Sequence, residues 1–190
     1  MVEYGNYKET LTTKMPLTCE LKLSFRPLDL MNKWQRCGLT ADFISQFETI
    51  GQSHIRTKNV LSTAVNELLE NAVKFSCDKT QHAHIHITSH ETKIRIEVTN
   101  HSDKQDADTL KKFLTVFFSK DFDVNTFFIK QVEKGGNVGY GEGSQLGFYT
   151  LSHNYQSQLS ARITKTESPE IYKITIAIEL EKESAYDHKN

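Results

Sequence analysis

The sequence predicts a two-layer α/β sandwich, in which helices cover one face of a mixed, mainly antiparallel β-sheet. Two pairs of alternating segments, 81–89 with 93–99 and 158–166 with 171–180, each predict neighbouring strands joined by a short turn. The segment 57–76 repeats apolar residues at the helical period. Strands that alternate in this way bury only one face, so we expect the helices on that face.

Length and composition predict one domain. The 190 residues are 37% hydrophobic and 25% charged, which is enough for one core and gives no reason for two. We expect a single domain over 1–180 and a solvated tail over 181–190. The formal net charge is -1, so the composition does not indicate binding to nucleic acid or to an anionic membrane surface.

Cysteine usage predicts a reducing compartment. Cys19, Cys37 and Cys77 are odd in number and scattered, without the spacing of a metal site, as expected for reduced thiols. No apolar run has the length of a membrane helix, and the first residues lack the apolar region of a signal peptide. We therefore expect a cytoplasmic protein.

The first elements in the chain are a strand and two short helices. Leu17–Phe25 alternates apolar and polar residues and predicts a strand. Leu28–Arg36 and Ala41–Ile50 predict helices separated by Gly38, with Thr40 as the N-cap of the second. The long helix 57–76 follows them.

Three histidines lie on the polar side of the strand Gln81–Ser89, namely His82, His84 and His86. This row raises the possibility of a metal site. Alternate residues of one strand are spaced about 6.5 to 7 Å apart, which is too far for one tetrahedral zinc without other ligands. We expect a solvent-facing row of polar residues.

The segments 106–119 and 124–133 predict two helical pieces that are rich in phenylalanine. Such clustering is typical of core under a loop, and the alternative is a mobile cover over a site or a docking surface for a partner. The glycine-rich segment 134–143 is a candidate lid hinge. A helix over about 144–155 leads into the last two strands. The phenylalanines are Phe113, Phe117, Phe118, Phe122, Phe127 and Phe128.

The long helix places three functional groups in one narrow polar strip. At roughly 100° per residue, Glu67, Asn71 and Lys74 lie beside an apolar face. A carboxylate, an amide and an ammonium would then face one cavity. The alternative is an ordinary amphipathic helix whose polar side faces water.

A glycine-rich segment, 139–147, runs directly into the next predicted helix. Glycines let a backbone approach a ligand closely, and a helix start offers free N–H groups and a positive dipole end. This arrangement predicts an anion site. Together with the polar strip, it predicts a phosphate-bearing ligand and its metal ion.

Two motifs resemble those of a known superfamily. Asn66–Phe75, NELLENAVKF, resembles the N box of the GHKL superfamily, the Bergerat-fold ATP-binding domains of gyrase, Hsp90 and histidine kinases. Gly141–Phe148 resembles the later glycine box of histidine kinases and of single-domain anti-sigma serine kinases. The resemblance covers roughly Ser53–Leu180 and implies the Bergerat fold, with ATP and Mg²⁺ as ligands.

The resemblance also implies roles for individual residues. Asn71 would coordinate Mg²⁺ through its side-chain oxygen, Glu67 would be the general base, and Lys74 would offset phosphate charge. Asn100 would contact the adenine base. The glycine-segment residues expected to bind the nucleotide are Gly139, Gly141, Gly143, Ser144, Gln145, Leu146 and Gly147.

The chain departs from the family pattern at two places. The family has Asp-x-Gly-x-Gly after the second hairpin strand, whereas this chain has Asn100-His101-Ser102-Asp103. Asn100 could accept the adenine amino group through its amide oxygen, but without charge assistance. This leaves the affinity and specificity for adenine open. The second departure is Gln145, where the family usually has glycine.

The resemblance implies a Mg-ATP-dependent serine/threonine kinase of a bacterial partner-switching pathway, similar to anti-sigma kinases and to the SiaB-like branch. Its substrate would be a small regulatory protein. Anti-sigma kinases also imply a homodimer, for which the exposed sheet face or the N-terminal segment could supply the contact. The alternative is a degenerate GHKL module that sequesters a partner with weak or no nucleotide turnover. A histidine sensor kinase and a chaperone or topoisomerase head fit the sequence less well.

Overall fold

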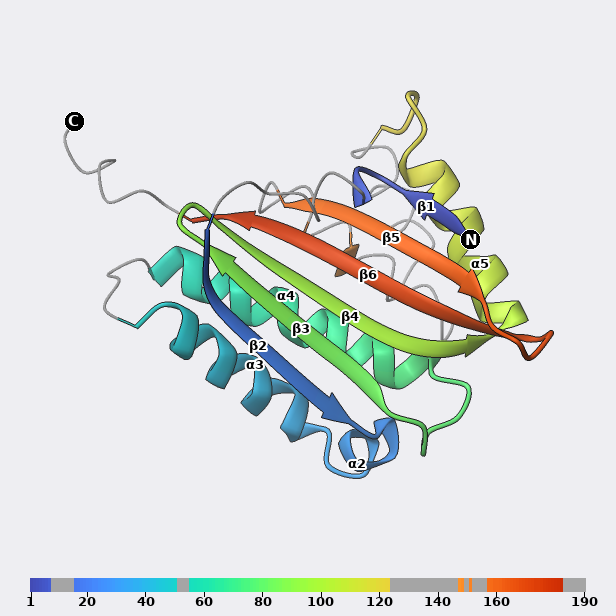
Figure 1. Cartoon of the computed structure of the whole chain (residues 1–190), viewed down its shortest axis with the longest axis horizontal. Helices are drawn as coiled ribbons and strands as arrows, with labels where there is room; N and C mark the ends of the chain where they lie inside the picture. The colour runs from blue at the N-terminus through green and yellow to red at the C-terminus, as the bar shows by residue number, and fades with distance from the viewer. Residues whose placement is uncertain (8–15, 51–54, 124–146, 149–150, 152–156, 183–190) are drawn as a thin grey trace, which may run out of the picture.

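The structure, a computed structural model, describes residues 1–7, 16–50, 55–123, 147–148, 151 and 157–182. The elements in chain order are β1 Val2–Tyr4, β2 Leu17–Phe25, α2 Pro27–Met31, α3 Gln35–Glu48, α4 Ile55–Phe75, β3 Ala83–His90, β4 Lys93–Asp103, α5 Lys104–Phe117, β5 Gln158–Lys165 and β6 Ile171–Glu181. Figure 1 shows these elements along the chain.

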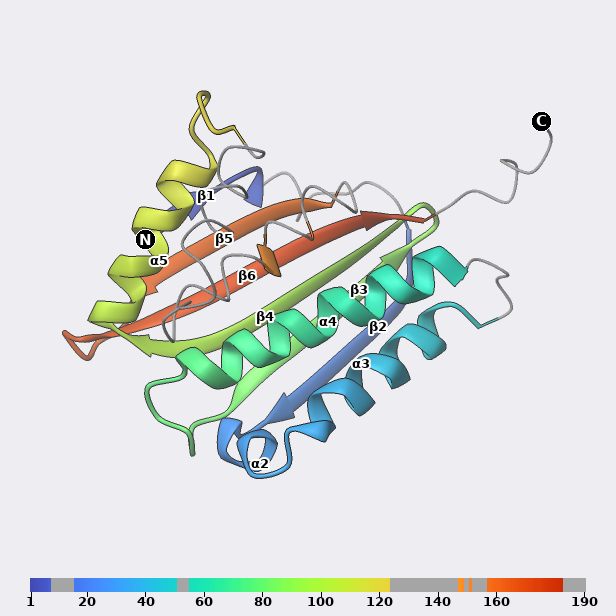
Figure 2. The same cartoon turned by 180° about the vertical axis from the view of Figure 1, so that it is seen from behind.

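The six described strands form one antiparallel sheet in the order β1-β5-β6-β4-β3-β2. Figure 2 shows α4 across the sheet, with α3 next to it on the β2 side and α5 on the β1 side. The predicted two-layer α/β sandwich is therefore confirmed. The predicted hairpins are also present, with Ile87 opposite Ile96 in the first and Ile163 opposite Ile174 in the second.

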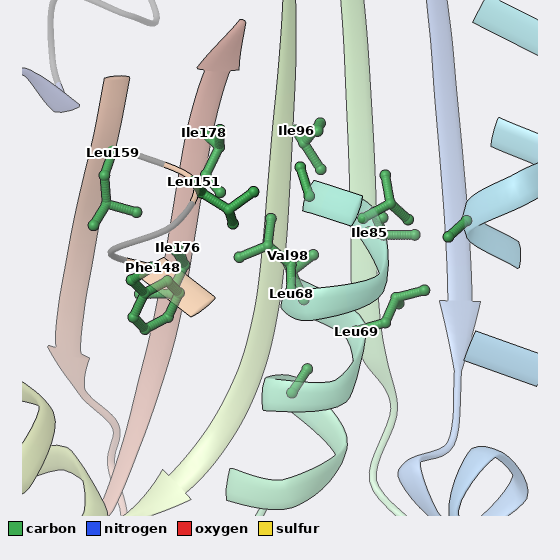
Figure 3. Packing of buried hydrophobic residues seen from close by; sticks show 14 of the residues in the cluster. Leu68, Leu69, Ile85, Ile96, Val98, Phe148, Leu151, Leu159, Ile176 and Ile178 are labelled. Atoms are coloured by element: carbon green, nitrogen blue, oxygen red, sulfur yellow. The ribbon is translucent and has the colours of Figure 1, made fainter. Parts of the chain in front are cut away.

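The core lies between the sheet and α4, because both carry apolar residues at the period of their own geometry. Leu68 and Leu69 of α4 face Ile85, Ile96 and Val98 of the strands (Figure 3). Phe148, Leu151 and Leu159 extend the same cluster towards β6 and β5. The position of α4 is thus fixed by burial, which also fixes where its polar strip points.

The predicted break at Gly38 is wrong. The helix α3 runs from Gln35 through Gly38 to Glu48, and its N-cap is Trp34 rather than Thr40. A Cβ at Gly38 would meet nothing within 4 Å, so no crowding requires glycine there. The helix continues because Cys37 and Ala41 are both buried on its inner side, and that burial outweighs the low helix propensity of one glycine.

Periodicity missed the first strand. Val2–Tyr4 pairs with β5 in a register that sets Val2 opposite Ile163. Tyr7 then lies on the open face of the sheet, where its hydroxyl donates to Glu97 and its ring lies beneath Arg162 and Arg95. The N-terminal segment is therefore part of the domain and not a free arm.

The histidine row lies on the open face as expected. His82 and His84 are exposed, and His86 lies 2.8 Å from a carboxylate oxygen of Glu20 on β2. Several other predictions fall outside the described residues: the helix 124–133, the lid hinge 134–143, most of the helix 144–155 and most of the tail. Among the described helices, none is both long enough and apolar enough to cross a membrane.

Candidate functional site

A cavity of about 110 Å³ opens between α4 and α5, over β4 and β6. Its size is comparable to an apolar cavity of about 150 Å³ that binds benzene in another protein, so it can take one planar ring. Its walls are mainly apolar, with a few polar groups. The lining residues are Asn71, Ala72, Phe75, Val98, Asn100, Ser102, Asp106, Thr109, Leu110, Phe113, Phe148, Ile174 and Ile176.

Two asparagine amides face this cavity without a partner for their nitrogen. Asn71 on α4 is 7% exposed and Asn100 on β4 is 6% exposed. The Nδ2 of each is buried and has no hydrogen-bond partner among the described residues. A buried donor without a partner costs about 1–3 kcal/mol. Both amides therefore retain hydrogen-bonding capacity that the described residues do not use.

The two asparagines are held in place by contacts between the end of α4 and β4. Ser102 Oγ donates to the carbonyl of Phe75 at 2.7 Å, and the Cys77 amide donates to the carbonyl of His101 at 2.9 Å. Since β4 continues to Asp103, past the predicted end at Thr99, Asn100 lies within a paired strand. Both amides are thus carried on rigid elements, as a binding site requires.

Glu67 lies one turn before Asn71 and is partly buried. Burial raises the pKa of its carboxyl, Glu70 raises it further, and Lys74 acts in the opposite direction. The carboxyl therefore holds its proton more strongly than an exposed glutamate does. This is the direction of tuning that a general base near neutral pH needs.

Gly147 lies directly against Glu67. A Cβ placed on Gly147 would overlap the carboxylate of Glu67, so only glycine fits there while Glu67 keeps its position. The neighbouring Phe148 lines the cavity, and its ring centroid is 6.0 Å from that of Phe113. The structure therefore brings the end of the glycine segment to the polar strip of α4.

Of the three residues expected to face one cavity, only Asn71 lines it, and Glu67 and Lys74 do not. The ammonium of Lys74 lies 3.6 Å from a carboxylate oxygen of Glu70 and 6.0 Å from the ring centroid of Trp34. In this structure Lys74 therefore faces the α2–α3 side, away from the position that phosphate binding would need.

Most of the predicted phosphate-binding residues lie outside the described part of the chain. Only Gly147 of that set is described. The others are Gly139, Gly141, Gly143, Ser144, Gln145 and Leu146.

The helix α5 contributes cavity residues that sequence reasoning did not select. Asp103 caps α5 by accepting from the Asp106 amide at 2.9 Å, and Asp106, Leu110 and Phe113 face the cavity. Burial raises the pKa of Asp106, Asp103 adds to this, and Lys79 opposes it. Residues 106, 110 and 113 have the spacing of one helical face. This spacing is the signal from which one wall of the site could have been predicted.

The predicted metal site of the resemblance rests on one amide, Asn71. Within the described ranges, no group of three or more histidine, cysteine, aspartate or glutamate side chains could hold a metal ion. Asn71 nevertheless fits the expected role, because an amide oxygen is a hard ligand and a phosphate-bound Mg²⁺ takes few protein ligands.

Comparison with known proteins agrees with this geometry. No curated protein matches the chain significantly. The profile of the family described as histidine kinase-, DNA gyrase B- and HSP90-like ATPases matches residues 57–183, which is more than half of the 190 residues. The match includes most of α4, the cavity and the glycine segment. The antiparallel sheet with its helices is the fold expected of this family. The chain therefore belongs to the histidine kinase-, DNA gyrase B- and HSP90-like ATPases, a family of nucleotide-binding domains.

Proposed function

We propose that the chain is a protein serine/threonine kinase that transfers the γ-phosphoryl group of ATP to a small regulatory protein, in a pathway of the bacterial partner-switching type. The observation that carries this proposal is the position of Glu67. Its carboxyl is partly buried, has a raised pKa, and lies against Gly147, one turn from the cavity residue Asn71.

The reaction needs a proton acceptor for the attacking hydroxyl. The hydroxyl oxygen of the acceptor side chain bonds to the γ-phosphorus, while the bond from that phosphorus to the β–γ bridging oxygen breaks and ADP leaves with the electron pair. The hydroxyl proton passes to the Glu67 carboxylate. A raised pKa makes Glu67 a stronger proton acceptor than an exposed glutamate.

The cavity suits the base of the nucleotide. Val98, Ile174 and Ile176 supply an apolar wall for a planar ring, and Asn100 supplies the polar contact to its edge. The ribose and phosphates would extend out of the cavity, past Asn71, towards Gly147. Asn71 would hold Mg²⁺, which when bound neutralises phosphate charge.

A degenerate binding module is the second candidate, and one observation favours it. Ser102 stands where the family has glycine, and its hydroxyl donates a hydrogen bond to the carbonyl of Phe75. Asn100 also replaces a charged acceptor with a neutral amide. In this reading the protein sequesters its partner and binds nucleotide weakly or not at all.

Calorimetry with ATP and Mg²⁺ separates the two candidates, followed by transfer of labelled phosphate to proteins captured from the native cell. For a kinase we expect Glu67→Gln to bind ATP like the wild type while transfer falls about 10²–10⁴-fold. Asn71→Ala should lose both binding and transfer.

The matched control is Glu91→Gln, an exposed carboxylate in the turn between β3 and β4, which should change neither measurement. Absence of binding heat at millimolar nucleotide would favour the sequestering module. Undiminished transfer by Glu67→Gln would remove Glu67 from the mechanism.

A further inference from the structure

The helix α5 forms one wall of the cavity, and its start is fixed by a cap. Asp103 at the end of β4 accepts from the Asp106 amide in the first turn of the helix. Further along, Leu110 and Phe113 face the cavity. A side chain that borders a hollow lacks the contacts that packed atoms would supply there. The position of this wall therefore depends on contacts made elsewhere along α5.

Tyr4 of β1 supplies such contacts near the other end of the helix. Its hydroxyl donates to the carbonyl of Lys111 at 3.4 Å and lies 3.4 Å from Thr115 Oγ1. Its ring stacks on that of Phe118, the C-cap residue of α5, with the centroids 6.4 Å apart. Figures 1 and 2 both show α5 on the β1 side of the sheet. A strand at the start of the chain thus holds the end of a cavity wall.

The backbone at Gly5 brings the chain close to α5. Gly5 has a φ of 65°, which glycine adopts at no steric cost. A Cβ there would lie 2.6 Å from the carbonyl oxygen of Leu159 and 3.1 Å from the ring of Phe118. Two residues later, Tyr7 is buried on the open face and donates to Glu97. The N-terminal segment therefore forms a close junction with both the sheet and α5.

A series of ring contacts leads from this junction to the cavity. The centroid distances are 5.1 Å from Phe118 to Phe117, 5.6 Å from Phe117 to Phe113 and 6.0 Å from Phe113 to Phe148. The last two rings line the cavity. Each aromatic contact of this kind contributes about 0.5–1.5 kcal/mol beyond area burial. A displacement of Phe118 is therefore opposed, ring by ring, as far as the cavity.

We propose that Tyr4 is a positioning residue for the nucleotide site, and that docking of β1 on β5 and nucleotide binding in the cavity favour each other. The element with two states is β1, which has three residues and lies at one end of the described sheet. Chain ends open locally at a lower free energy than core strands do. Docked β1 holds α5 through Tyr4, and opened β1 releases it. This inference rests on the proposed nucleotide in the cavity.

Loss of the Tyr4 contacts should move the wall without unfolding it. The Asp103 cap does not depend on Tyr4. The ammonium of Lys111 lies 4.4 Å from the ring centroid of Tyr172 on β6, and Leu114 is fully buried. These contacts keep α5 on the sheet when β1 opens. The expected result is a folded domain that binds nucleotide more weakly.

The first test measures binding of ATP with Mg²⁺ to the full-length protein by calorimetry. Tyr4→Ala should weaken binding about fivefold or more, as expected of coupled sites. Phe47→Ala is the matched control and should bind like the wild type. It removes a ring of α3 that is 46% exposed and whose centroid lies 6.0 Å from that of Phe43, outside the series. Circular dichroism establishes that each variant is folded at the temperature used.

The second test uses the reciprocity of coupling and needs only the wild type. Saturation with ATP and Mg²⁺ should slow hydrogen exchange of the amides in the β1–β5 ladder, between Val2–Tyr4 and Ala161–Ile163, by about the same factor. In Tyr4→Ala this slowing should be lost. A residue with only a structural role would lower the melting temperature and leave both the affinity and the exchange response unchanged.

Three results would overturn the coupling while leaving the proposed function in place. They are wild-type affinity in Tyr4→Ala, ladder exchange that nucleotide does not change, and an equal loss of affinity in Phe47→Ala. Absence of binding heat in the wild type would instead refute nucleotide binding itself, and the coupling with it.

Discussion

Glu67 lies in surroundings that favour its neutral form. Burial and the nearby Glu70 both raise the pKa of its carboxyl. The folded state then binds more protons than the unfolded state between the ordinary pKa, about 4.3, and the raised one. Across that interval, stability falls as pH rises, because the charged form must be held in a partly buried place.

Glutamine imitates the neutral carboxyl and cannot ionise. We therefore expect Glu67→Gln to match the wild type in melting temperature at the acidic end of that interval and to exceed it increasingly as pH rises to neutrality. Thermal unfolding of both proteins over a pH series measures this. Parallel curves for the two proteins would mean that Glu67 has the pKa of an exposed glutamate.

Asn100 can both donate and accept, whereas an aspartate can only accept. An amide can pair with the N1 and amino group of adenine or, rotated, with the O6 and N1–H of guanine. We expect the wild type to discriminate weakly between ATP and GTP. Asn100→Asp should shift the preference towards GTP by about 1–2 kcal/mol, because a carboxylate can accept from both the N1–H and the N2 amino group of guanine but only from the amino group of adenine. Competitive calorimetry measures the ratio. An unchanged ratio would show that Asn100 does not contact the base.

At the scale of elements, α4 and the end of the glycine segment meet through a glycine. In Gly147→Ala, the new methyl overlaps the end of the Glu67 side chain, which must turn aside, so we expect a small destabilisation, on the order of 0.5–1.5 kcal/mol for a side chain pushed off its preferred rotamer. With Glu67→Ala in the background, the obstacle is gone and the cost of Gly147→Ala should fall. Denaturant unfolding of the four proteins in this double-mutant cycle measures the coupling. Equal costs in both backgrounds would contradict the contact.

The helix α3 offers the opposite case. Gly38 lies within it and has open space where a Cβ would be. Gly38→Ala should therefore stabilise the protein by about 0.5–1 kcal/mol, because alanine loses less backbone freedom on folding. Urea unfolding at constant m-value measures the gain. A loss of stability would reveal a requirement for glycine that the helix geometry does not show.

Periodicity predicted the elements well wherever a segment was long. The helix predicted over 57–76 is Ile55–Phe75, and Leu17–Phe25 was predicted with its observed ends. The break at Gly38 was wrong, because propensity is local while the burial of Cys37 against the core is not. Val2–Tyr4 is too short to show a period, and its partner strand lies at the other end of the sequence.

Part of the candidate site was predictable from helical periodicity and from motifs, and the rest depends on contacts between distant segments. Glu67 and Asn71 follow from one helix, and Gly147 from its motif. Asp106 and Phe113 become cavity residues only through the packing of α5 over the sheet. The orientation of Lys74 depends on Glu70 and a tryptophan from another helix, which spacing along α4 does not reveal.

At the scale of the whole molecule, the N-terminal segment is tied to the open face of the sheet. Tyr7 is buried, its ring lies beneath two arginines, and its hydroxyl donates to Glu97 at 3.1 Å. Tyr7→Phe should cost about 1.5–3 kcal/mol, the range for a hydrogen bond to a charged group. Urea unfolding measures this cost. An unchanged midpoint would mean that the ring alone holds the segment.

The strand β6 comes last among the described elements, yet it lies inside the sheet between β4 and β5. The cavity spans the join between β4 and β6, with Val98 on one side and Ile176 on the other. A nascent chain still attached to the ribosome therefore has no complete cavity until β6 has emerged. If the cavity holds the nucleotide as proposed, nucleotide cannot assist the early folding of this protein during translation and can stabilise only the domain in which β6 is already paired.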